Sequence, residues 1–332
     1  MCSNWTRGNR KEDMTLEQIE QAFSSTLWKD IENASISGGE PTTRNDLVDI
    51  ARVMIDKFPK LRKLTLNTTG ITHHRAIPML TKIVQLCNER NVIFSTRVSI
   101  DGVNDMHGQV RNVRNAFEKA GKTIAAMKEL QKTHRFNFGI SSTIFSQNLE
   151  DADNILAWAK KEHLDIVFNM VRFTDAMLGN SELEGKYRPM GVEEQKMRKF
   201  FLDRVRQDPL LDGQNYIYMH YADMIANGYH RTAPCPFMTQ GIMLNPNGDM
   251  FFCENSDVVG NVTKDDPEAI YFREDAQAHR REIRDQKCPS CLSPCQMNVA
   301  AIKQVVPYAR FLVRASMEKR RAGTPVAAAA PA

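Results

Sequence analysis

The sequence lacks long apolar runs, a strong net charge and an apolar leader at its start. Its apolar tracts are a few residues long, far short of the ~20 residues that a membrane-spanning helix needs. The net charge of +4 is small, and the lysines and arginines are scattered, so charge indicates no nucleic-acid partner. Residues 1–11 hold basic side chains without the apolar core of a signal peptide. We therefore expect a cytoplasmic protein with no membrane partner.

Cysteine is scarce before residue 235, where only Cys2 and Cys87 occur, whereas five more cysteines follow. In a reducing compartment such a cluster indicates metal or redox chemistry and not a set of disulfides. The length of 332 residues is typical of about two domains, or of one barrel with an appendage. The uneven placement of cysteine predicts a division of the chain between residues 180 and 230.

The front half alternates β-rich runs with amphipathic helical patterns. Strands are predicted at residues 33–37, 63–68, 92–100, 136–144 and 166–173. The first helix is expected to begin at a capping box formed by Thr15 and Gln18. Such repeats are typical of β-α units on a parallel sheet or barrel. We predict an α/β fold, a partial (β/α)6 barrel similar to a TIM barrel that lacks its first strand, followed by a smaller C-terminal domain.

Residues 92–100 give the clearest strand pattern in the chain. Phe94 and Val98 alternate with Ser95, Arg97 and Ser99, so one face is apolar and the other is polar. In a β/α barrel the outward face packs under helices and the inward face lines the centre. The polar row is therefore expected to face a ligand.

The rear half follows a different pattern. Two helical stretches are expected within residues 191–230. The run Asn-Pro-Asn-Gly-Asp at 245–249 predicts a β-hairpin with Gly248 at a positive φ, and Asp266 before Pro267 predicts a helix start. The Ala/Pro-rich end predicts disorder. We expect four parts: a partial barrel over 1–180, a helical connector over 181–230, a cysteine-bearing domain over 231–318 and a disordered tail over 319–332.

Five cysteines crowd the rear half. They are Cys235, Cys253, Cys288, Cys291 and Cys295, the last three in the spacing Cys-x2-Cys-x3-Cys. Four converging thiolates suit a tetrahedral zinc ion or an iron-sulfur cluster. The fifth cysteine leaves the ligand set open, and we favour the first four. Spacing also leaves open a zinc ribbon that only stabilises a small domain. A hydrolytic zinc site is disfavoured because four thiolates leave no position for water.

Three successive strand ends carry small or polar residues. The segments are Ser37-Gly38-Gly39-Glu40-Pro41, Asn67-Thr68-Thr69-Gly70 and Ser99-Ile100-Asp101-Gly102. The carboxyl ends of barrel strands are where such enzymes bind their ligands. Paired glycines let the backbone approach a ligand closely, and a neighbouring carboxylate can accept hydrogen bonds from an ammonium group.

With these motifs the chain resembles radical S-adenosylmethionine (SAM) enzymes that have a C-terminal SPASM or twitch domain, over nearly everything except the tail. The resemblance implies SAM binding by strand-end residues: Gly38, Gly39, Glu40 and Pro41 at the amino group, Ser99 and Asp101 at the ribose and carboxylate, with Asn67 as a further contact. His107 and Arg111 match a His and an Arg of the family that organise the next loop or the SAM carboxylate.

The spacing Cys235-x12-Gly248-x4-Cys253 is similar to the auxiliary-cluster signature of the family. The resemblance therefore implies a small C-terminal α+β iron-sulfur domain. One auxiliary [4Fe-4S] cluster is expected instead of two, because the closing cysteine run is shorter than the full SPASM pattern. Glu254 follows Cys253 directly, where some relatives carry a general base, and a plain surface carboxylate is the alternative.

The start of the chain departs from the family pattern. The radical cluster of the family is bound by Cys-x3-Cys-x2-Cys, of which Cys2 matches only the third. Cys87 lies on an apolar helical stripe and is expected in the core, so it does not complete the set. We expect either an N-terminally truncated sequence or a chain that has lost radical chemistry, inactive as it stands.

The resemblance implies reductive cleavage of SAM to a 5′-deoxyadenosyl radical, which abstracts hydrogen from a peptide or small-molecule substrate. The auxiliary cluster then accepts an electron from the substrate radical or anchors the substrate. Asn169 and Arg172 are candidate substrate contacts, and flavodoxin or ferredoxin is the implied electron donor. The alternative is a non-catalytic SAM- or peptide-binding metalloprotein, because two radical-cluster cysteines are absent.

Overall fold

Five parallel strands form the main sheet of the computed structural model, which describes residues 12–174, 178–231, 233, 235, 237, 239–293, 305–321 and 323. The strands are β1 (Asn33–Ile36), β2 (Lys63–Thr68), β3 (Ile93–Ser99), β4 (Asn137–Ile144) and β5 (Asp165–Met170). They lie in the order β1-β2-β3-β4-β5, so neighbours in the sheet are also neighbours along the chain. Such parallel neighbours need crossover connections, which helices supply. The α/β class and the five predicted strands are confirmed, and closure into a partial barrel stays a prediction.

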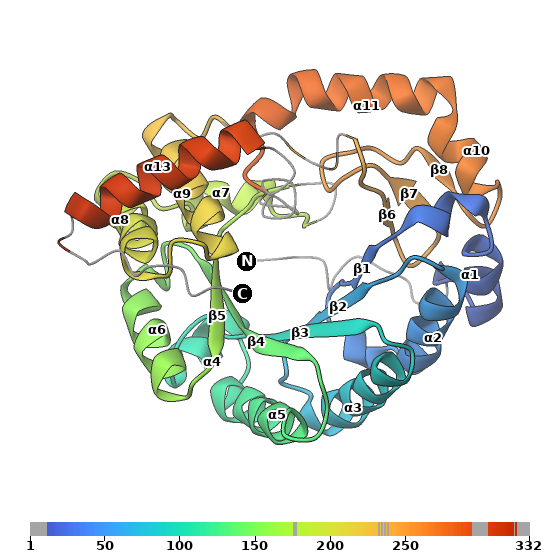
Figure 1. The fold of residues 1–332 in the computed structure, drawn as a ribbon, viewed down its shortest axis with the longest axis horizontal. Helices are drawn as coiled ribbons and strands as arrows, with labels where there is room; N and C mark the ends of the chain where they lie inside the picture. The colour runs from blue at the N-terminus through green and yellow to red at the C-terminus, as the bar shows by residue number, and fades with distance from the viewer. Residues whose placement is uncertain are drawn as a thin grey trace.

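Helices cover the outer side of this sheet (Figure 1). The helices of the front half are α1 (Leu16–Ala22), α2 (Leu47–Lys57), α3 (His73–Glu89), α4 (Asp105–Arg111), α5 (Ala116–Leu130) and α6 (Ala152–Lys161). On α3, Leu80, Ile83 and Cys87 are fully buried, which confirms the predicted place of Cys87 in the core. The capping box of α1 is also confirmed, since the Thr15 N–H donates to Gln18 Oε1 (2.9 Å) and the Gln18 N–H donates to Thr15 Oγ1 (3.2 Å).

Strand β3 alternates in burial as its sequence predicts. Phe94, Thr96 and Val98 are at most 1% exposed, whereas Arg97 and Ser99 are partly exposed. Because successive side chains of a strand point to opposite faces, the apolar face packs under the helices and the polar row lies on the inner face of the sheet.

The rear half adds two groups of elements. The first is helical, with α7 (Glu184–Tyr187), α8 (Val192–Gln207), α9 (Gly213–Ala226) and α13 (Val305–Arg321). The second holds the antiparallel strands β6 (Met243–Leu244), β7 (Asp249–Phe251) and β8 (Gly260–Asn261), then α10 (Pro267–Phe272) and α11 (Glu274–Gln286). The predicted hairpin is confirmed, with Gly248 at a φ of +89°, and Asp266 caps α10 as predicted. The second group lies on the β1 side of the sheet, and its helix α11 runs from α10 toward α13 along the top of the view (Figure 1).

Helix α13 packs against α8 and α9 and continues through Arg321. Its Lys319–Arg321 segment was predicted as the start of the disordered tail, and that part of the prediction is wrong. Lys319 Nζ donates to the carbonyls of Arg206 (3.0 Å) and Asp208, which fixes the last turn of the helix. The rest of the predicted tail, apart from Gly323, lies outside the described residues.

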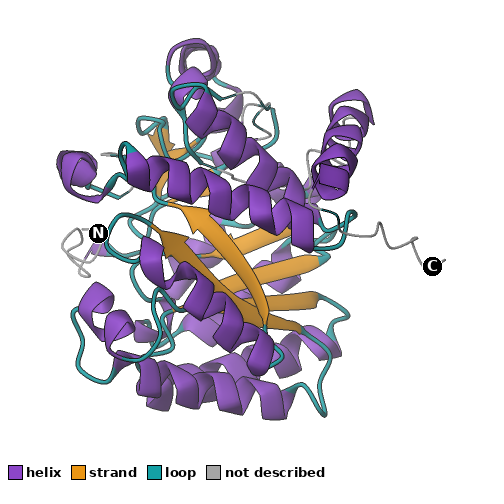
Figure 2. Cartoon of the chain, turned by 90° about the vertical axis from the view of Figure 1, so that its left-hand side faces the viewer, coloured by secondary structure: helices purple, strands orange, loops and turns teal. Residues whose placement is uncertain are grey.

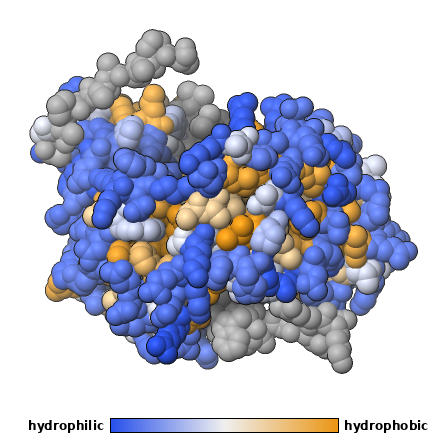
Figure 3. Space-filling view, turned by 90° about the horizontal axis from the view of Figure 1, so that it is seen from below, coloured by the Kyte–Doolittle hydropathy of each residue, from blue (hydrophilic) through white to orange (hydrophobic). Residues whose placement is uncertain are grey.

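Short one-turn helices complete the described part of the chain. They are Thr26–Asp30, Pro41–Thr43, Leu149–Asp151, Ser181–Leu183 and Cys288–Ser290. In Figure 2 the strands of the main sheet lie between layers of helices. The face seen from below is mainly hydrophilic, with apolar side chains gathered near its middle (Figure 3). Among the described residues, none of the helices combines the length and the apolar character that crossing a membrane requires.

Candidate functional site

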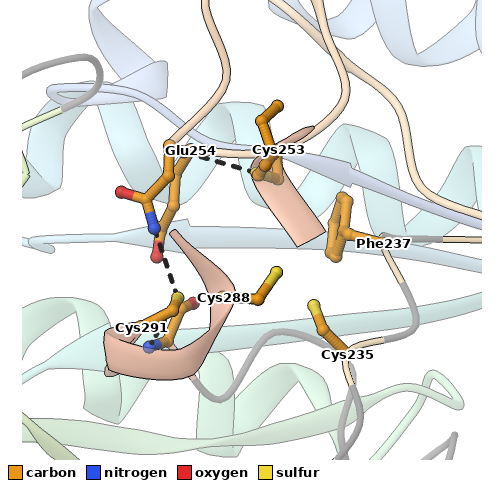
Figure 4. A pocket seen from close by; sticks show the side chains of 9 residues that line it. Cys235, Phe237, Cys253, Glu254, Cys288 and Cys291 are labelled. Carbon is orange, nitrogen blue, oxygen red and sulfur yellow. Dashed lines mark hydrogen bonds between the residues drawn. The ribbon is translucent and has the colours of Figure 1, made fainter. Parts of the chain in front are cut away.

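Four cysteines from three parts of the chain line one cavity (Figure 4). Cys235 comes from the loop after α9, Cys253 follows β7, and Cys288 and Cys291 lie in and directly after the turn that ends α11. The cavity is also lined by Phe237, Glu254, Asn255, Ile283 and Ser293. All four cysteines are free thiols. These are the four that the sequence favoured as ligands, whereas Cys295 and Cys2 lie outside the described residues.

The thiols influence one another electrostatically. Burial, reinforced by the other three cysteines, raises the pKa of Cys253 to about 12. Burial and the neighbouring thiols Cys235 and Cys291 raise the pKa of Cys288 to about 11, and burial raises the pKa of Cys291 as well. Thiols in this state are protonated at neutral pH, so a bound metal centre would displace their protons.

Two of the cysteine sulfur atoms accept hydrogen bonds from nitrogen donors. The Asn255 backbone N–H donates to Cys253 Sγ (3.4 Å), and its side-chain Nδ2 donates to Cys291 Sγ (3.2 Å). The Ser293 backbone N–H also donates to Cys291 Sγ (3.4 Å). Hydrogen bonds to ligating sulfur are a normal part of iron-sulfur sites. The donor set and its surroundings therefore fit a cluster bound by four thiolates.

Sequence reasoning missed Asn255 and Ser293, although a signal for both exists. Each residue follows a cavity cysteine by two positions, Asn255 after Cys253 and Ser293 after Cys291. In both cases the backbone N–H turns back to the sulfur of that cysteine. The residue two positions beyond a predicted ligand is thus the place to look for a donor.

Glu254 faces the same cavity and is 5% exposed, so it is not a surface carboxylate. Its Oε2 atom lies 2.5 Å from Arg172 Nη1, which also donates to Ser293 Oγ (2.8 Å). Its Oε1 atom is buried and makes no hydrogen bond within the described part of the chain. Because Arg172 comes two residues after β5, this ion pair brings the cysteine cavity next to the carboxyl end of that strand. Asn169, inside β5, has no comparable contact with the cavity among the described residues.

Glu40 joins the ends of β1 and β2. Its Oε1 atom accepts hydrogen bonds from the N–H (3.1 Å) and Oγ1 (2.7 Å) of Thr42 and from Thr68 Oγ1 (2.8 Å). Its Oε2 atom accepts from the N–H (2.7 Å) and Oγ1 (2.6 Å) of Thr69. A carboxylate offers about four lone-pair positions, so the threonines use its capacity. Glu40 acts as a brace between two loops, a role that sequence reasoning did not give it.

The loop next to Glu40 has open space at Gly38. Its φ is +145°, which disfavours any residue with a side chain, and a Cβ built there would have no atom within 4 Å. Pro41 begins the one-turn helix that follows Glu40. Gly39 lies between Gly38 and Glu40 in the same exposed loop. The loop therefore offers exposed backbone at the carboxyl end of β1, which fits the close approach of a ligand.

The other strand-end residues fall into two groups. Asn67 is exposed on β2, and Ser99 is partly exposed at the end of β3. Asp101, by contrast, is 1% exposed, and its carboxylate lies 2.6 Å from Arg111 Nη2 and accepts from the Thr143 N–H (2.9 Å). The buried Asp101 therefore fastens the loop after β3 to β4.

His107 completes this corner. Its Nδ1 accepts a hydrogen bond from the Asp101 N–H (3.1 Å), and the side chain is fully buried. Burial, with a smaller contribution from the Arg111 charge, lowers the pKa of His107 to about 4. A neutral His107 and an ion-paired Arg111 support the loop-organising role expected for both.

Two family models match the chain. Residues 1–159 match the model described as the Radical SAM superfamily, and residues 235–296 match an iron-sulfur cluster-binding domain, SPASM. The chain carries a radical SAM domain and a SPASM domain. All four cavity cysteines belong to the SPASM domain, and Glu40 and Asp101 belong to the radical SAM domain. The expected cofactors, SAM and an iron-sulfur cluster, are confirmed at the level of these two families.

One relative and two solved structures extend the comparison. AdoMet-dependent heme synthase from Methanosarcina barkeri (strain Fusaro / DSM 804) is 32% identical over 127 residues, 38% of this chain and 32% of the relative. The chain thus aligns with about a third of that relative's length. Native anSMEcpe with bound AdoMet and Cp18Cys peptide is 15% identical with a TM-score of 0.57, over 91% of this chain and 92% of the other. Streptococcus suis SuiB is 15% identical with a TM-score of 0.54, over 89% and 69%. These structures share the fold.

The radical SAM domain offers few ligands for a three-thiolate cluster. Its matched residues contain two cysteines, Cys2 and Cys87. Cys87 is fully buried on α3, and burial raises its pKa to about 12. A buried, protonated thiol in the helical layer is not available to a cluster at the strand ends. The residues of this domain in the sequence therefore do not fit a cluster bound by three thiolates.

Proposed function

We propose that this chain is part of a radical SAM enzyme that generates a 5′-deoxyadenosyl radical from SAM and removes hydrogen from a peptide or small-molecule substrate. Its SPASM domain would bind an auxiliary [4Fe-4S] cluster through Cys235, Cys253, Cys288 and Cys291. The convergence of these thiols with Glu254 on one cavity beside the end of β5 carries the proposal.

The match of residues 235–296 to a model described as an iron-sulfur cluster-binding domain favours a cluster over a zinc ion. Each iron of a [4Fe-4S] cluster takes one thiolate, and the cavity is lined by four cysteines. When bound, the auxiliary cluster would supply electron transfer or an anchor for substrate.

The residues of the chain would bind and orient the reactants. The exposed backbone at Gly38 would receive SAM, with Glu40 holding that loop in place and the Asp101 corner shaping the next one. Glu254 would accept a proton from a substrate hydroxyl or thiol through its unpartnered Oε1 atom, while Arg172 fixes its other oxygen. We propose a cytoplasmic location and a flavodoxin or ferredoxin as electron donor.

The fold neighbours support a peptide as the substrate class, since anSMEcpe has been solved with bound peptides. The relative named as a heme synthase supports a small molecule, although the alignment spans only a third of its length. The second candidate function is a non-catalytic SAM- or peptide-binding metalloprotein. The observation that favours it is the lack of fit between the radical SAM domain and a three-thiolate cluster.

Anaerobic reconstitution with iron and sulfide tests the cluster site. We expect about four irons per chain, a loss of most of this iron in the double variant Cys235→Ala/Cys253→Ala, and no loss in the control Cys87→Ala. Binding of one zinc ion without iron would contradict the proposal.

Calorimetric titration with SAM tests the strand-end site. Gly38→Ala should weaken SAM binding, because its φ of +145° strains any side chain. Gly121→Ala is the matched control, since Gly121 lies in α5 and a Cβ there would also meet no atom within 4 Å. SAM binding that survives Gly38→Ala unchanged would place the ligand elsewhere.

A further inference from the structure

Arg231 ties the connector after α9 to the loop that carries two of the cavity cysteines. Its backbone N–H donates to the Pro289 carbonyl (2.7 Å). Its Nε donates to the Ala233 carbonyl (2.7 Å), and its Nη1 donates to the Ser293 carbonyl (2.6 Å) and, at 3.5 Å, to the Cys291 carbonyl. The guanidinium therefore sits against the backbone of the cysteine loop.

The charge of Arg231 has no acidic partner in the part of the chain that the structure describes. Every hydrogen bond of its side chain there goes to a carbonyl oxygen. Its Nη2 atom is shielded from solvent and has no hydrogen-bond partner among the described residues. A shielded cation without a counter-charge is unfavourable, so an anion next to this guanidinium would be stabilised.

The loop against which this guanidinium sits carries Cys288 and Cys291, since Arg231 Nη1 donates to the carbonyls of Cys291 and Ser293. Cysteine sulfurs are deprotonated when they bind a metal centre, so cluster binding would bring negative charge to this loop. Asn255 adds a second favourable contact, since its Nδ2 donates to Cys291 Sγ (3.2 Å). Cysteine thiolates around a [4Fe-4S] core carry net negative charge, and one-electron reduction adds one more negative charge. Positive charge and hydrogen-bond donors at the sulfurs therefore favour the reduced form.

We propose that Arg231 is the charge partner of the auxiliary cluster, and that its guanidinium and the Asn255 amide together raise the reduction potential of this cluster. The inference rests on the proposed function, because it requires a cluster at the four cavity cysteines. Arg231 and Asn255 are proposed as positioning residues that act on the cluster through its sulfur ligands.

The test is a redox titration of the anaerobically reconstituted full chain, with dithionite as one-electron reductant and the EPR signal of the reduced cluster as readout. Arg231→Gln removes the charge and keeps a donor, whereas Arg231→Lys keeps the charge and removes the planar fork. Asn255→Ala removes the side-chain donor to Cys291. The control is Arg90→Gln, which removes the same charge from an exposed pair with Asp56 in the radical SAM domain.

We expect a more negative midpoint potential in Arg231→Gln, a smaller shift in the same direction in Asn255→Ala, and nearly unchanged potentials in Arg231→Lys and Arg90→Gln. If Arg231→Gln fails to retain iron while Arg231→Lys retains it, the charge requirement is also supported. Equal potentials in all variants, or equal loss of iron from Arg231→Gln and Arg231→Lys, would overturn the inference. If the unmodified chain binds no cluster, it is the proposed function that fails.

Discussion

Glu40 at the strand ends of the radical SAM domain and Glu254 in the cysteine cavity of the SPASM domain differ in how completely their carboxylates are paired. At the strand ends, Glu40 accepts five hydrogen bonds from neighbouring threonines. At the cavity, Glu254 Oε1 is shielded and unpartnered among the described residues, and so is Nη2 of Arg231 beside the cysteine loop. Since buried polar groups are nearly always satisfied, Glu40 is satisfied by the protein alone, whereas Glu254 and Arg231 are completed by what the cavity binds.

Removing the cluster should change the stability of the protein more than any other perturbation proposed here, and it should test the contrast between the two regions most clearly. A ligand that binds only the folded state stabilises it by about 4 kcal/mol at a thousandfold excess over its Kd. We expect chelation of iron from the reconstituted chain to lower the thermal unfolding temperature of the SPASM domain. Calorimetry measures this temperature. The double variant Cys235→Ala/Cys253→Ala should respond little to the same chelator, and an equal response of both proteins would contradict the cluster site.

Glu40→Gln should break the strand-end region while sparing the cavity. The new amide group would face the N–H and hydroxyl of Thr69 or of Thr42, so buried donors lose their acceptor. We expect the free energy of unfolding to fall by about 2–3 kcal/mol, measured by urea denaturation, with unchanged iron content. Glu129→Gln, at an exposed pair with Lys132, is the control and should cost about 0.5 kcal/mol or less. Loss of iron in Glu40→Gln would show that the two regions are not independent.

The buried corner at His107 predicts a pH dependence of stability. The pKa of His107 lies near 4 in the fold because of burial and Arg111, against 6.5 ordinarily. The unfolded chain therefore binds a proton that the fold does not bind, so stability is lost as pH falls from about 6.5 towards 4, by at most about 3 kcal/mol. His107→Gln should flatten this slope in urea titrations at several pH values. The pKa of His220 is also lowered to about 4, mainly by burial, so His220 should maintain the remaining pH dependence of the free energy of unfolding. An unchanged slope in His107→Gln would contradict the role given to His107.

Gly121→Ala should have the smallest effect and the opposite sign. Gly121 lies inside α5 with open space around its Cα, so alanine should stabilise the helix by about 0.5–1 kcal/mol. Urea denaturation measures the gain. A loss of stability would contradict the open surroundings of Gly121.

Much of the fold could be predicted from the sequence because local patterns determine it. The alternation along β3, the capping box at Thr15 and the hairpin turn at Gly248 each depend on residues close together in the chain. The crowding of five cysteines after residue 234 is also visible in the sequence, and four of them line the cavity. The choice of these four as the ligands stays a prediction.

The contacts that complete both regions join residues far apart in the sequence. Glu40 meets Thr69, Arg172 meets Glu254, and Arg231 meets the loop of Cys291 only after folding. A carboxylate next to paired glycines predicts an ammonium contact, which stays a prediction, and nothing local indicates that threonines of two loops also donate to Glu40. The end of α13 was missed for a similar reason, because its lysine bonds to carbonyls more than a hundred residues earlier.

Hydrogen–deuterium exchange of the full chain before and after anaerobic reconstitution tests the contrast between the two regions most directly. The account predicts that cluster loading, verified by iron content, slows exchange in residues 249–261 and 274–291 and leaves residues 33–45 and 63–75 unchanged. Equal protection of both regions, or no added protection around the cysteines of an iron-loaded chain, would contradict it.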